Sequence, residues 1–574
     1  MTDIMAKYDL WCARATEDAD VTAELQSVAG NDAEIRDRFY RELAFGTGGL
    51  RGVIGAGSNR MNIYTVRKAT QGLADYLNAR YDAATVAVSF DSRIKSDLFA
   101  RESACVLAAN GISVHLFPQL EPTPVLSYAV RYYGCQAGIM VTASHNPAKY
   151  NGYKVYGPDG CQMTDSDAGD VLGYINKVDL FDNVKTISYD EAVASGKIQL
   201  IPDSVLDSYT DCVLAQQVNP GIIAESGLRL VYTPLNGTGN LPVREMLRRV
   251  GIQDLTIVKE QELPDGNFPT APFPNPEIRQ AFECALATAK ALPQPADLLL
   301  ATDPDCDRVG IAVWDGTDYT LMSGNEVGCL LLDYCVSCRK ANGTLPENPV
   351  VIKTIVTTNL AKSIAQKYDC ELRDLLTGFK YIGEQIGLLE KDGEENRYVI
   401  GFEESYGYLA GAYVRDKDAV VASMLIVEMA SYYRKQGLSL LERMEQLYQE
   451  HGFYRNALVN VAFEGEQGMH DMQKLMAGLR ECPPKAIAGI PVVACADYGQ
   501  RVATDFVTGD RTPLTLPKSD VLAYTLEGGL GLIVRPSGTE PKVKAYITAI
   551  GDTPAAAAEM EQKLCAEAEK LLTV

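Results

Sequence analysis

Residues 85–141 contain the stretch that decides the fold: TVAVSF (85–90), SDLFARESACVLAANG (96–111), ISVHLF (112–117), a helical stretch after Pro124, and QAGIMV (136–141). Short β-branched or apolar runs alternate here with longer amphipathic stretches, which predicts the order strand, helix, strand, helix, strand. Strands that alternate with helices form a mostly parallel sheet with helices on both faces. The sequence therefore predicts an α/β domain in this part of the chain.

The same alternation occurs twice more. One region runs from LRLVYT (228–233) to DLLLAT (297–302), and the next from PVVIKTIV (349–356) to RYVIGF (397–402). The three regions share little residue identity, so their relationship is a hypothesis based on pattern alone.

The last part of the chain has a different pattern. Helical stretches at about 464–481 and 553–572 flank VLAYTLEGGLGLIVRP (521–536), which predicts two strands joined at a Gly-Gly turn. We therefore predict three related mixed-sheet α/β domains and a C-terminal α+β domain, arranged around a central cleft.

Composition excludes several classes of protein. The 574 residues include 53 Lys+Arg and 75 Asp+Glu, a formal net charge of −22, with 47% hydrophobic and 22% charged residues. This is the balance of a globular protein, and its acidity disfavours nucleic acid and anionic membranes as partners. The N-terminal MTDIMAKYDL has acids and no long apolar stretch, so we expect no secretory signal there, and apolar runs are much shorter than the roughly 20 residues of a membrane helix. We expect a cytoplasmic protein.

The cysteines give no sign of a disulfide framework. Fourteen are scattered through the chain, and the pair Cys335 and Cys338 is its one C-x-x-C. The surrounding GCLLLDYCVSCRK has helical periodicity and no neighbouring His, so a buried helix face is favoured over zinc or redox chemistry.

Polar loops follow the last strand of each predicted α/β region. They are TASHNP (142–147), TDPDCDR (302–308) and EESYGY (403–408). Ligands of open α/β sheets bind beyond the carboxyl ends of the strands. We therefore expect the three loops to converge on one cleft between domains.

The first loop presents Ser144. A small residue before it and Asn-Pro after it predict a tight turn that exposes the hydroxyl as a nucleophile. The alternative is a polar turn with a hydrogen-bonding serine. The loop is not a G-x-S-x-G elbow, and with four His in the chain a Ser-His-Asp triad has little support.

The second loop spaces Asp303, Asp305 and Asp307 at i, i+2 and i+4 after an apolar strand. Three carboxylates that point to one position suit a hard divalent cation such as Mg²⁺. Calcium binding of the EF-hand type is excluded, because Arg308 and Trp314 occupy the positions that need Gly and Glu. A solvated acidic turn is the alternative, but three close like charges after a buried strand favour a metal.

Two further loops contain groups that suit a sugar phosphate. The carboxylates and hydroxyl of Glu403-Glu404-Ser405 can accept and donate hydrogen bonds to sugar hydroxyls, although Glu pairs also occur on solvated surfaces. Arg535-Pro536-Ser537-Gly538-Thr539 can cradle a phosphate, with a simple Pro-Gly turn as the alternative. Neither a Walker motif nor a full G-x-G-x-x-G is present.

Taken together and in this order, these loops resemble those of the α-D-phosphohexomutases, the phosphoglucomutase/phosphomannomutase superfamily. The matching motifs are GTGGLRG (46–52), TASHNPAKYNGYK (142–154), DPDCDR (303–308), TGFKYIG (377–383), FEESYGY (402–408), RDKDA (415–419) and RPSGTEPK (535–542). The resemblance implies four domains around a deep cleft. It assigns them as a phosphoserine domain (1–205), a metal-binding domain (206–320), a sugar-binding domain (321–450) and a phosphate-binding C-terminal domain (451–574).

The resemblance also implies the roles of individual residues. Ser144 matches the phosphorylated serine, and it joins Asp303, Asp305 and Asp307 as the ligands of Mg²⁺. Arg51, His145, Lys154 and Lys417 match catalytic positions, with His145, Lys154 and Lys417 as open candidates for the general base. The substrate-binding positions are Arg308, Thr377, Glu403, Ser405, Arg535, Ser537, Gly538 and Thr539.

The expected reaction interconverts α-D-glucose 1-phosphate and glucose 6-phosphate, with glucose 1,6-bisphosphate as activator and intermediate. Mannose-active relatives often have Met at the position of Glu404, which favours glucose over mannose. Pentose-phosphate mutases also resemble this long form, so phosphomannomutase and phosphopentomutase of the same superfamily stay as alternatives. Two other classes stay open, a metal-dependent sugar phosphatase and a non-catalytic sugar-phosphate sensor. The chain departs from the common pattern at Pro304, Cys306 and Phe402, where many members have Gly. The oligomeric state is left open.

Overall fold

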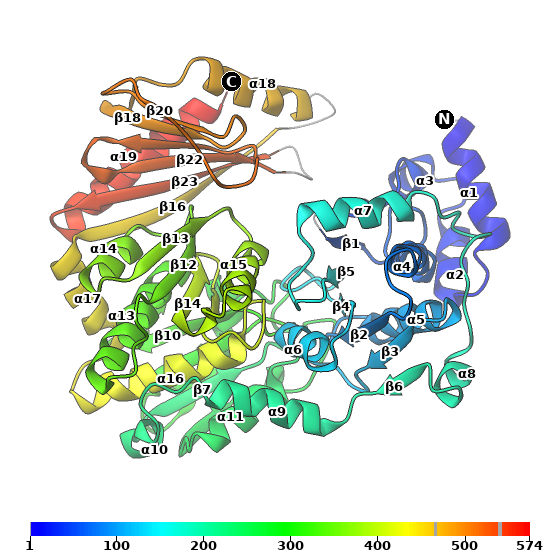
Figure 1. The fold of residues 1–574 in the computed structure, drawn as a ribbon, viewed down its shortest axis with the longest axis horizontal. Helices are drawn as coiled ribbons and strands as arrows, with labels where there is room; N and C mark the ends of the chain where they lie inside the picture. Colours follow the sequence, from blue (N-terminus) through cyan, green and yellow to red (C-terminus); the bar gives the residue numbers. More distant parts are fainter. Residues whose placement is uncertain (1, 47, 464–467, 538–541, 574) are drawn as a thin grey trace. The chain divides into compact units, whose positions relative to one another are not determined.

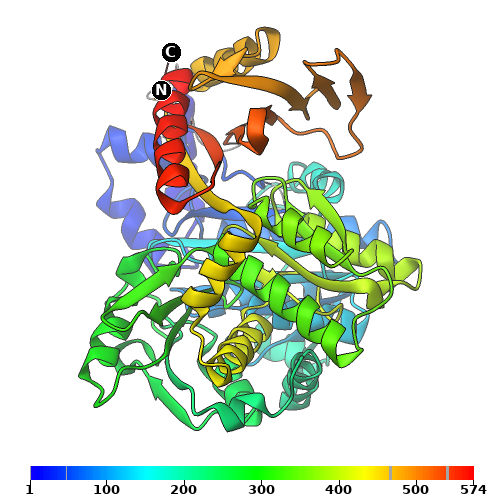
Figure 2. The same cartoon turned by 90° about the vertical axis from the view of Figure 1, so that its left-hand side faces the viewer.

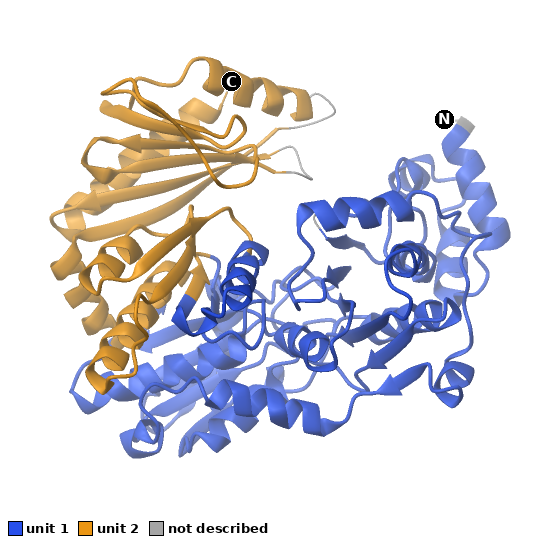
Figure 3. Ribbon diagram, viewed as in Figure 1, with its two compact units in different colours: residues 1–323, 379–400, 405–439 blue, residues 324–378, 401–404, 440–574 orange. Residues whose placement is uncertain are grey.

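The structure, a computed structural model, describes residues 2–46, 48–463, 468–537 and 542–573 (Figure 1). The chain divides into two compact units (Figure 3). Unit 1 comprises residues 1–323, 379–400 and 405–439, and unit 2 comprises residues 324–378, 401–404 and 440–574.

Unit 1 begins with helices that precede the predicted sheet. They are α1 (Thr2–Arg14), α2 (Ala19–Ser27) and α3 (Asp32–Phe39). Trp11 is buried and makes edge contacts with the rings of Phe39, Tyr64 and Phe181. Aromatic pairs of this geometry contribute beyond the area they bury. The three helices thus pack on the first α/β region, an addition that the sequence pattern did not predict.

The first α/β region of unit 1 confirms the predicted alternation. Its elements are β1 (Gly49–Val53), α4 (Ile63–Asn78), β2 (Thr85–Phe90), α5 (Ser96–Ala109), β3 (Ser113–Leu116), α6 (Thr123–Tyr133), β4 (Ala137–Val141), β5 (Tyr150–Tyr156), α7 (Asp165–Ile175), α8 (Tyr189–Ala194) and β6 (Ile198–Leu200). The strand order is β1-β5-β4-β2-β3-β6 (Figure 1). The strands β4, β2, β3 and β6 run parallel, whereas β5 is antiparallel to both β1 and β4. The sheet is therefore mixed.

The second α/β region of unit 1 is also a mixed sheet. Its elements are α9 (Asp203–Leu214), α10 (Ile222–Ser226), β7 (Arg229–Thr233), α11 (Asn240–Arg249), β8 (Asp254–Ile257), α12 (Glu283–Ala291), β9 (Leu298–Thr302), β10 (Val309–Trp314) and β11 (Tyr319–Met322). The strand order is β11-β10-β9-β7-β8, with β9 parallel to β7 and antiparallel to β10. Every residue of β9 is buried, as its run of Leu predicts, and the strand ends directly before Asp303.

The last part of unit 1 contains α15 (Phe379–Lys391), the start of β14 (Tyr398–Glu403), β15 (Gly407–Leu409) and α16 (Ala419–Lys435). Asp418 caps α16, because its carboxylate accepts hydrogen bonds from the backbone N–H groups of Val420 and Val421. The same carboxylate accepts hydrogen bonds from the hydroxyls of Tyr209 and Tyr413. This network fixes the turn that contains Asp416 and Lys417.

The first part of unit 2 contains α13 (Gly324–Asn342), β12 (Val350–Thr354), α14 (Leu360–Lys367), β13 (Glu371–Leu375) and α17 (Leu440–His451). The strands β12 and β13 pair in parallel, as a strand-helix-strand pattern predicts. Cys335 and Cys338 are both buried on α13, which confirms the interpretation of the C-x-x-C as a buried helix face.

The C-terminal part of unit 2 is a sheet with two helices. Its elements are β16 (Phe453–Ala462), α18 (Gly468–Glu481), β17 (Ala486–Ile487), β18 (Ile490–Asp497), β19 (Val502–Asp505), β20 (Arg511–Pro513), β21 (Leu522–Leu526), β22 (Gly531–Pro536), β23 (Lys542–Gly551) and α19 (Pro554–Leu572). The strand order is β16-β23-β22-β21-β18-β19-β20, and β17 pairs with β18. The predicted Gly-Gly turn between β21 and β22 is confirmed, with Gly528 and Gly529 at φ of 78° and 81°. Helix α19 lies along β16 and β23 (Figure 2).

The four regions form an α/β architecture that includes mixed sheets, as predicted, and the strand pairs of the C-terminal sheet are antiparallel. Within the described ranges, no helix combines the length and apolar character needed to cross a bilayer.

Candidate active site

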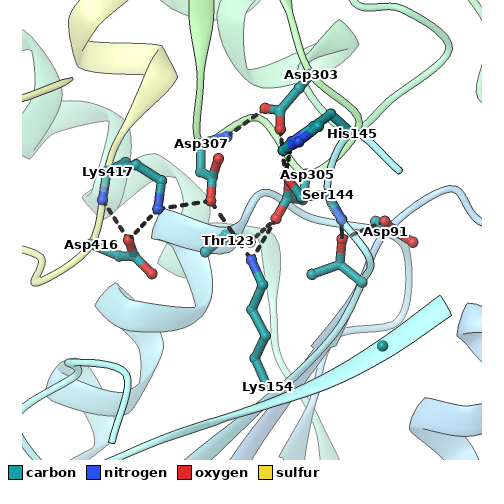
Figure 4. Close-up of polar contacts among 12 residues, drawn as sticks. Asp91, Thr123, Ser144, His145, Lys154, Asp303, Asp305, Asp307, Asp416 and Lys417 are labelled. Atoms are coloured by element: carbon teal, nitrogen blue, oxygen red, sulfur yellow. Dashed lines mark hydrogen bonds and ion pairs between the residues drawn. The ribbon is translucent and has the colours of Figure 1, made fainter. Parts of the chain in front are cut away.

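Ser144 lies in the loop between β4 and β5, directly beyond the carboxyl end of β4. Its hydroxyl donates a hydrogen bond to Oδ2 of Asp303 at 2.8 Å and lies 3.1 Å from Nδ1 of His145 (Figure 4). The backbone of Ser144 is left-handed, with φ of 51°. This turn directs the hydroxyl toward the loop after β9, so the structure brings together the first two polar loops predicted from the sequence.

The three aspartates after β9 form one compact group. Asp303, Asp305 and Asp307 are buried, and each offers a carboxylate oxygen within 4.8 Å of the others. Cys306 is at φ of 51°, in the left-handed conformation that glycine adopts most easily. The loop thus makes this turn with a residue that is not glycine.

Two lysines from different elements face this group. Nζ of Lys154, on β5, lies 3.0 Å from Oδ2 of Asp305 and 3.7 Å from Oδ2 of Asp307. Nζ of Lys417 lies 3.2 Å from Oδ2 of Asp307 and 3.0 Å from Oδ1 of Asp416 (Figure 4). The lysines offset the repulsion among the carboxylates.

The pKa values of the aspartates shift in different directions. Burial, together with repulsion from Asp305 and Asp307, raises the pKa of Asp303 well above its usual value. Burial also acts on Asp305, but the Lys154 ammonium overcomes it and lowers the pKa of that carboxyl. For Lys154 itself, burial favours the neutral form, yet the neighbouring carboxylates raise its pKa. Lys154 is therefore a cation at neutral pH.

The donor set fits a hard divalent cation. Oδ1 of Asp305 and Oδ1 of Asp307 are buried, and no group among the described residues donates a hydrogen bond to either. Buried carboxylate oxygens without donors are costly, and a cation with oxygen ligands would satisfy them. The group Asp303, Asp305 and Asp307 can thus bind a metal ion.

The other predicted residues of this region lie around the same group. Burial and the charges of Arg308 and Arg51 hold the pKa of His145 well below its usual value, so its ring is neutral at pH 7. Arg51 lies on β1, and its charge acts on Asp305 and Asp307. The backbone N–H of Arg308 donates to Oδ1 of Asp303, and its guanidinium pairs with Glu277 at 2.5 Å.

The sequence analysis missed several residues that fix these loops. The hydroxyl of Thr123, at the start of α6, donates to Oδ2 of Asp305 at 2.9 Å. Asp91 accepts a hydrogen bond from Thr142 at 2.6 Å, and Arg93 contacts the backbone of the serine loop. The signal was present, because Asp91-Ser92-Arg93 is a polar segment directly after a predicted strand. Because ligands of open α/β sheets bind beyond the carboxyl ends of the strands, the same reasoning applies to Asp91 and Arg93.

The predicted sugar-binding residues Thr377 and Glu403 lie in unit 2, and Ser405 lies in unit 1. Glu403 is buried at the end of β14, and its Oε1 accepts a hydrogen bond from the N–H of Gly378, next to Thr377. Oε2 of Glu404 accepts hydrogen bonds from the hydroxyls of Thr354 and Thr357 at 3.2 and 3.1 Å. Glu404 therefore attaches the loop after β14 to the end of β12 and the residues that follow it.

The predicted phosphate clamp also lies in unit 2. Arg535 is on β22, and Ser537 follows that strand, whereas Gly538 and Thr539 are outside the described residues. Burial raises the pKa of Tyr546, on β23, to about 12, and the charges of Glu404 and Arg535 both act on this phenol. The strand with Arg535 thus lies close to the Glu403-Glu404 loop within unit 2.

Comparison with known families defines the class of this fold and site. The chain matches, in order, the family descriptions "Phosphoglucomutase/phosphomannomutase, alpha/beta/alpha domain I" (residues 42–181), "domain II" (207–316), "domain III" (323–451) and "C-terminal domain" (458–567). These matches define a phosphohexomutase, an enzyme of the isomerase class. The chain belongs to the phosphoglucomutase/phosphomannomutase family, as the resemblance of its motifs indicated.

Curated relatives cover most of the chain. A protein of Staphylococcus saprophyticus named phosphoglucomutase is 37% identical over 512 residues, which are 89% of this chain and 91% of the relative. One of Staphylococcus aureus strain USA300 with the same name is 37% identical over 549 residues, which are 94% of this chain and 95% of the relative.

Solved structures share the fold. The open form of the Paramecium phosphoprotein parafusin, described as a phosphoglucomutase, has a TM-score of 0.69 at 16% identity and covers 93% of this chain and 95% of its own. A phosphoglucomutase/phosphomannomutase family protein of Burkholderia thailandensis has a TM-score of 0.66 at 18% identity and covers 92% of this chain and 97% of its own.

Proposed function

We propose that this enzyme is a phosphoglucomutase that interconverts α-D-glucose 1-phosphate and glucose 6-phosphate through a phosphorylated Ser144. The observation that supports this most directly is the contact between Ser144 Oγ and Asp303 Oδ2 at 2.8 Å, within a buried group of carboxylates. Such a group would hold a cation beside the oxygen that receives and donates the phosphoryl group. The relatives named phosphoglucomutase support the choice of substrate.

We propose Mg²⁺ as the metal, held by Asp303, Asp305, Asp307 and an oxygen of the phosphorylated Ser144. When bound, Mg²⁺ would neutralise the negative charge that spreads over the transferring phosphoryl group. Oδ1 of Asp305 and Oδ1 of Asp307, which accept no hydrogen bond from the residues that the structure describes, support this assignment.

The chain's own cations would complete the neutralisation. Lys154 remains protonated, because Asp305 and Asp307 raise its pKa, so it suits an electrostatic role better than that of general base. His145 is neutral and has its Nδ1 3.1 Å from the serine hydroxyl, which suits a group that exchanges a proton there. Lys417 is the remaining candidate for the base, and Arg51 would add positive charge beside the aspartates.

Substrate recognition is assigned to the other loops. Thr377, Glu403, Ser405 and Arg308 would bind the sugar, and Arg535, Ser537, Gly538 and Thr539 would bind the phosphate that does not react. Donation from Ser144 would give glucose 1,6-bisphosphate, which must present its other phosphate to complete the cycle. The four domains would then have the boundaries 1–205, 206–320, 321–450 and 451–574, and the enzyme would act in the cytoplasm on small sugar phosphates.

The test combines catalysis with mass spectrometry. The purified protein should isomerise glucose 1-phosphate in the presence of Mg²⁺, and glucose 1,6-bisphosphate should remove any lag. Peptide mass spectrometry should find phosphate on Ser144. Faster turnover of mannose 1-phosphate or ribose 1-phosphate would change the substrate, and release of inorganic phosphate would indicate a phosphatase. Binding without turnover or phosphorylation would indicate a sensor.

A further inference from the structure

The buried side chain of Arg93 packs against the backbone of the loop that contains Ser144. The side chain of Arg93, three residues after β2, has no exposed surface. Its Nη1 donates hydrogen bonds to the carbonyls of Pro147 and Tyr150 at 3.1 and 3.0 Å. Its Nη2 donates to the carbonyls of Ser144 and Asn146. Four carbonyl groups from one short segment therefore converge on a single guanidinium.

The guanidinium of Arg93 supplies hydrogen-bond donors to backbone carbonyls that have no partner in the β4–β5 ladder. Three of the four carbonyls lie between Ser144 and Pro147, a segment that connects the antiparallel strands β4 and β5 without joining their ladder, and the fourth belongs to Tyr150 at the start of β5. Carbonyl groups that are shielded from water in such a turn need donors, because leaving them unpaired costs free energy; Ser144 is buried, and Asn146, Pro147 and Tyr150 are partly buried. A guanidinium offers five N–H groups in a rigid plane, whereas a lysine offers three from one point. Arginine is thus the side chain that can serve all four carbonyls at once.

The conformation of Ser144 needs this support. A left-handed backbone is unfavourable for residues other than glycine and persists where the surroundings fix it. Here both polar backbone groups of Ser144 are bound by side chains. Its carbonyl accepts from Arg93, and its N–H donates to Oγ1 of Thr142 at 2.8 Å.

Arg93 is itself held in place. Its backbone N–H donates to Oδ1 of Asp91 at 2.9 Å, and Oδ2 of Asp91 accepts from the hydroxyl of Thr142 at 2.6 Å. The ring of Phe268 lies 5.0 Å from the guanidinium carbon, at the distance of a cation–π contact. Gly266 approaches so closely that a Cβ there would lie 2.5 Å from the backbone N of Ile94. The anchor therefore has little freedom to move.

We infer that Arg93 is a positioning residue for the phosphoryl-transfer step: with Thr142, it holds the backbone of Ser144 so that the hydroxyl faces Asp303. This inference rests on the proposed function, since it assigns a role in the reaction of Ser144. Arg93 needs no contact with the sugar phosphate to act in this way. Its loss should change the rate of transfer much more than the binding of substrate.

The test compares Arg93→Lys with Arg60→Lys. Arg60 is a matched control, because it is also buried and its guanidinium donates to the carbonyls of Asp37 and Asn59. The measurements are the melting temperature, kcat and KM for glucose 1-phosphate, and the single-turnover rate at which glucose 1,6-bisphosphate phosphorylates Ser144. Hydrogen exchange of residues 143–150 reports the order of the loop without any catalysis.

We expect Arg93→Lys to lower kcat and the phosphorylation rate about 100-fold, the loss that a misplacement of about 1 Å can cause. KM should stay within about threefold of wild type, since the variant removes no contact to substrate. Exchange in 143–150 should become faster. Arg60→Lys should lower the melting temperature and leave kcat and exchange of this segment unchanged.

A second pair of variants covers the case in which Arg93→Lys does not fold. Thr142→Val is nearly isosteric and removes the hydroxyl that binds Ser144 and Asp91, whereas Thr142→Ser keeps it. The serine variant should retain most of the wild-type kcat, and the valine variant should lose it.

Specific results would overturn the inference. They are equal kcat in Arg93→Lys and Arg60→Lys, equal kcat in the two Thr142 variants, or a rise in KM without a fall in kcat. A wild-type protein with no turnover and no phosphate on Ser144 would refute the proposed function instead. In that case unchanged exchange in 143–150 of Arg93→Lys would still overturn the anchoring role, and faster exchange would support it.

Discussion

The hydroxyl of Ser144 donates a hydrogen bond to Oδ2 of Asp303 across 159 residues of sequence, at a distance of 2.8 Å. Each residue follows a buried strand, β4 or β9, in a different α/β region of unit 1. Strands of two different sheets thus place the hydroxyl of Ser144 and the carboxylate of Asp303 in contact. The predictions below test what this meeting point does.

Replacing the serine tests the covalent step. Ser144→Ala should abolish isomerisation and incorporation of phosphate, because the variant has no oxygen to accept the phosphoryl group. A coupled assay and intact mass spectrometry would measure both effects. Ser195→Ala should remain active, because the hydroxyl of Ser195 donates its hydrogen bond to the carbonyl of Ala192 in the preceding helix α8. Substantial turnover by Ser144→Ala would contradict the phosphoserine mechanism.

Replacing an aspartate tests the metal site. Asp305→Asn should weaken Mg²⁺ binding by more than the roughly 10-fold that changes outside the ligand shell often cost. The measurements are a Mg²⁺ titration of activity and calorimetry of binding. Asp315→Asn, in an exposed acidic turn, is the control and should leave both unchanged. A titration of Asp305→Asn that matches wild type would exclude Asp305 as a ligand.

The ion pair between Lys154 and Asp305 predicts a stability effect that depends on the metal. Removal of one partner of a buried pair costs about 3–5 kcal/mol, because the other charge is left uncompensated. Lys154→Met should therefore lower the free energy of unfolding by this order in the presence of a chelator, and less with saturating Mg²⁺. Denaturant titrations would measure it.

Lys290→Met is the matched control for this experiment. Lys290 pairs with Asp318 at 3.1 Å with both side chains at least half exposed, and such pairs contribute roughly 0–1 kcal/mol. An equal loss in the two variants would show that Lys154 does not compensate a buried charge.

Glu121 predicts a pH dependence of stability. Burial raises the pKa of this carboxyl from 4.5 to about 8, so the folded state keeps a proton that the unfolded state loses between these values. The contribution of Glu121 to the free energy of unfolding is fully present below pH 4.5 and is lost as the pH rises through 8. Glu121→Gln should match wild type at pH 4.5 and unfold at higher temperature at pH 8.5.

Thermal unfolding over this pH range would measure the effect. One unit of pKa shift corresponds to about 1.4 kcal/mol, so the difference should be readily detected. Glu347→Gln, at an exposed position, should show the pH dependence of wild type. A constant difference between Glu121→Gln and wild type at all pH values would contradict the assignment.

Arg535 tests the phosphate clamp. Arg535→Ala should raise KM and lower kcat, each by roughly 10-fold or more, because a charge-assisted hydrogen bond of about 1.5–3 kcal/mol would be lost in both half-reactions. Steady-state kinetics in both directions would measure this. Arg511→Ala, exposed on β20, should behave as wild type. Unchanged kinetics in Arg535→Ala would remove it from the substrate site.

Much of the fold could be predicted because strand and helix patterns are local. The buried runs that became β4 and β9 are visible as apolar segments, and the polar residues after them identified Ser144 and the three aspartates. The Gly-Gly turn between β21 and β22 was likewise a local signal. These features depend on neighbours in sequence, so one sequence is enough to find them.

The contacts between distant residues could not be predicted in this way. Thr123 bonds Asp305 across 182 residues, and nothing in its local sequence indicates that partner. The antiparallel pairing of β5 with β1 and β4 depends on how the whole sheet assembles. The left-handed backbones of Ser144 and Cys306 were hidden because neither residue is glycine.

The buried thiol of Cys306 can report local unfolding of the loop that contains the aspartates. Its thiol has no exposed surface, and burial raises its pKa, so a thiol-modifying reagent can reach it only after the segment between β9 and β10 has unfolded locally. The rate of alkylation at this one sulfur therefore measures how often the aspartates lose their mutual arrangement. Occupancy by sugar phosphate or metal can then be followed chemically, without an introduced label.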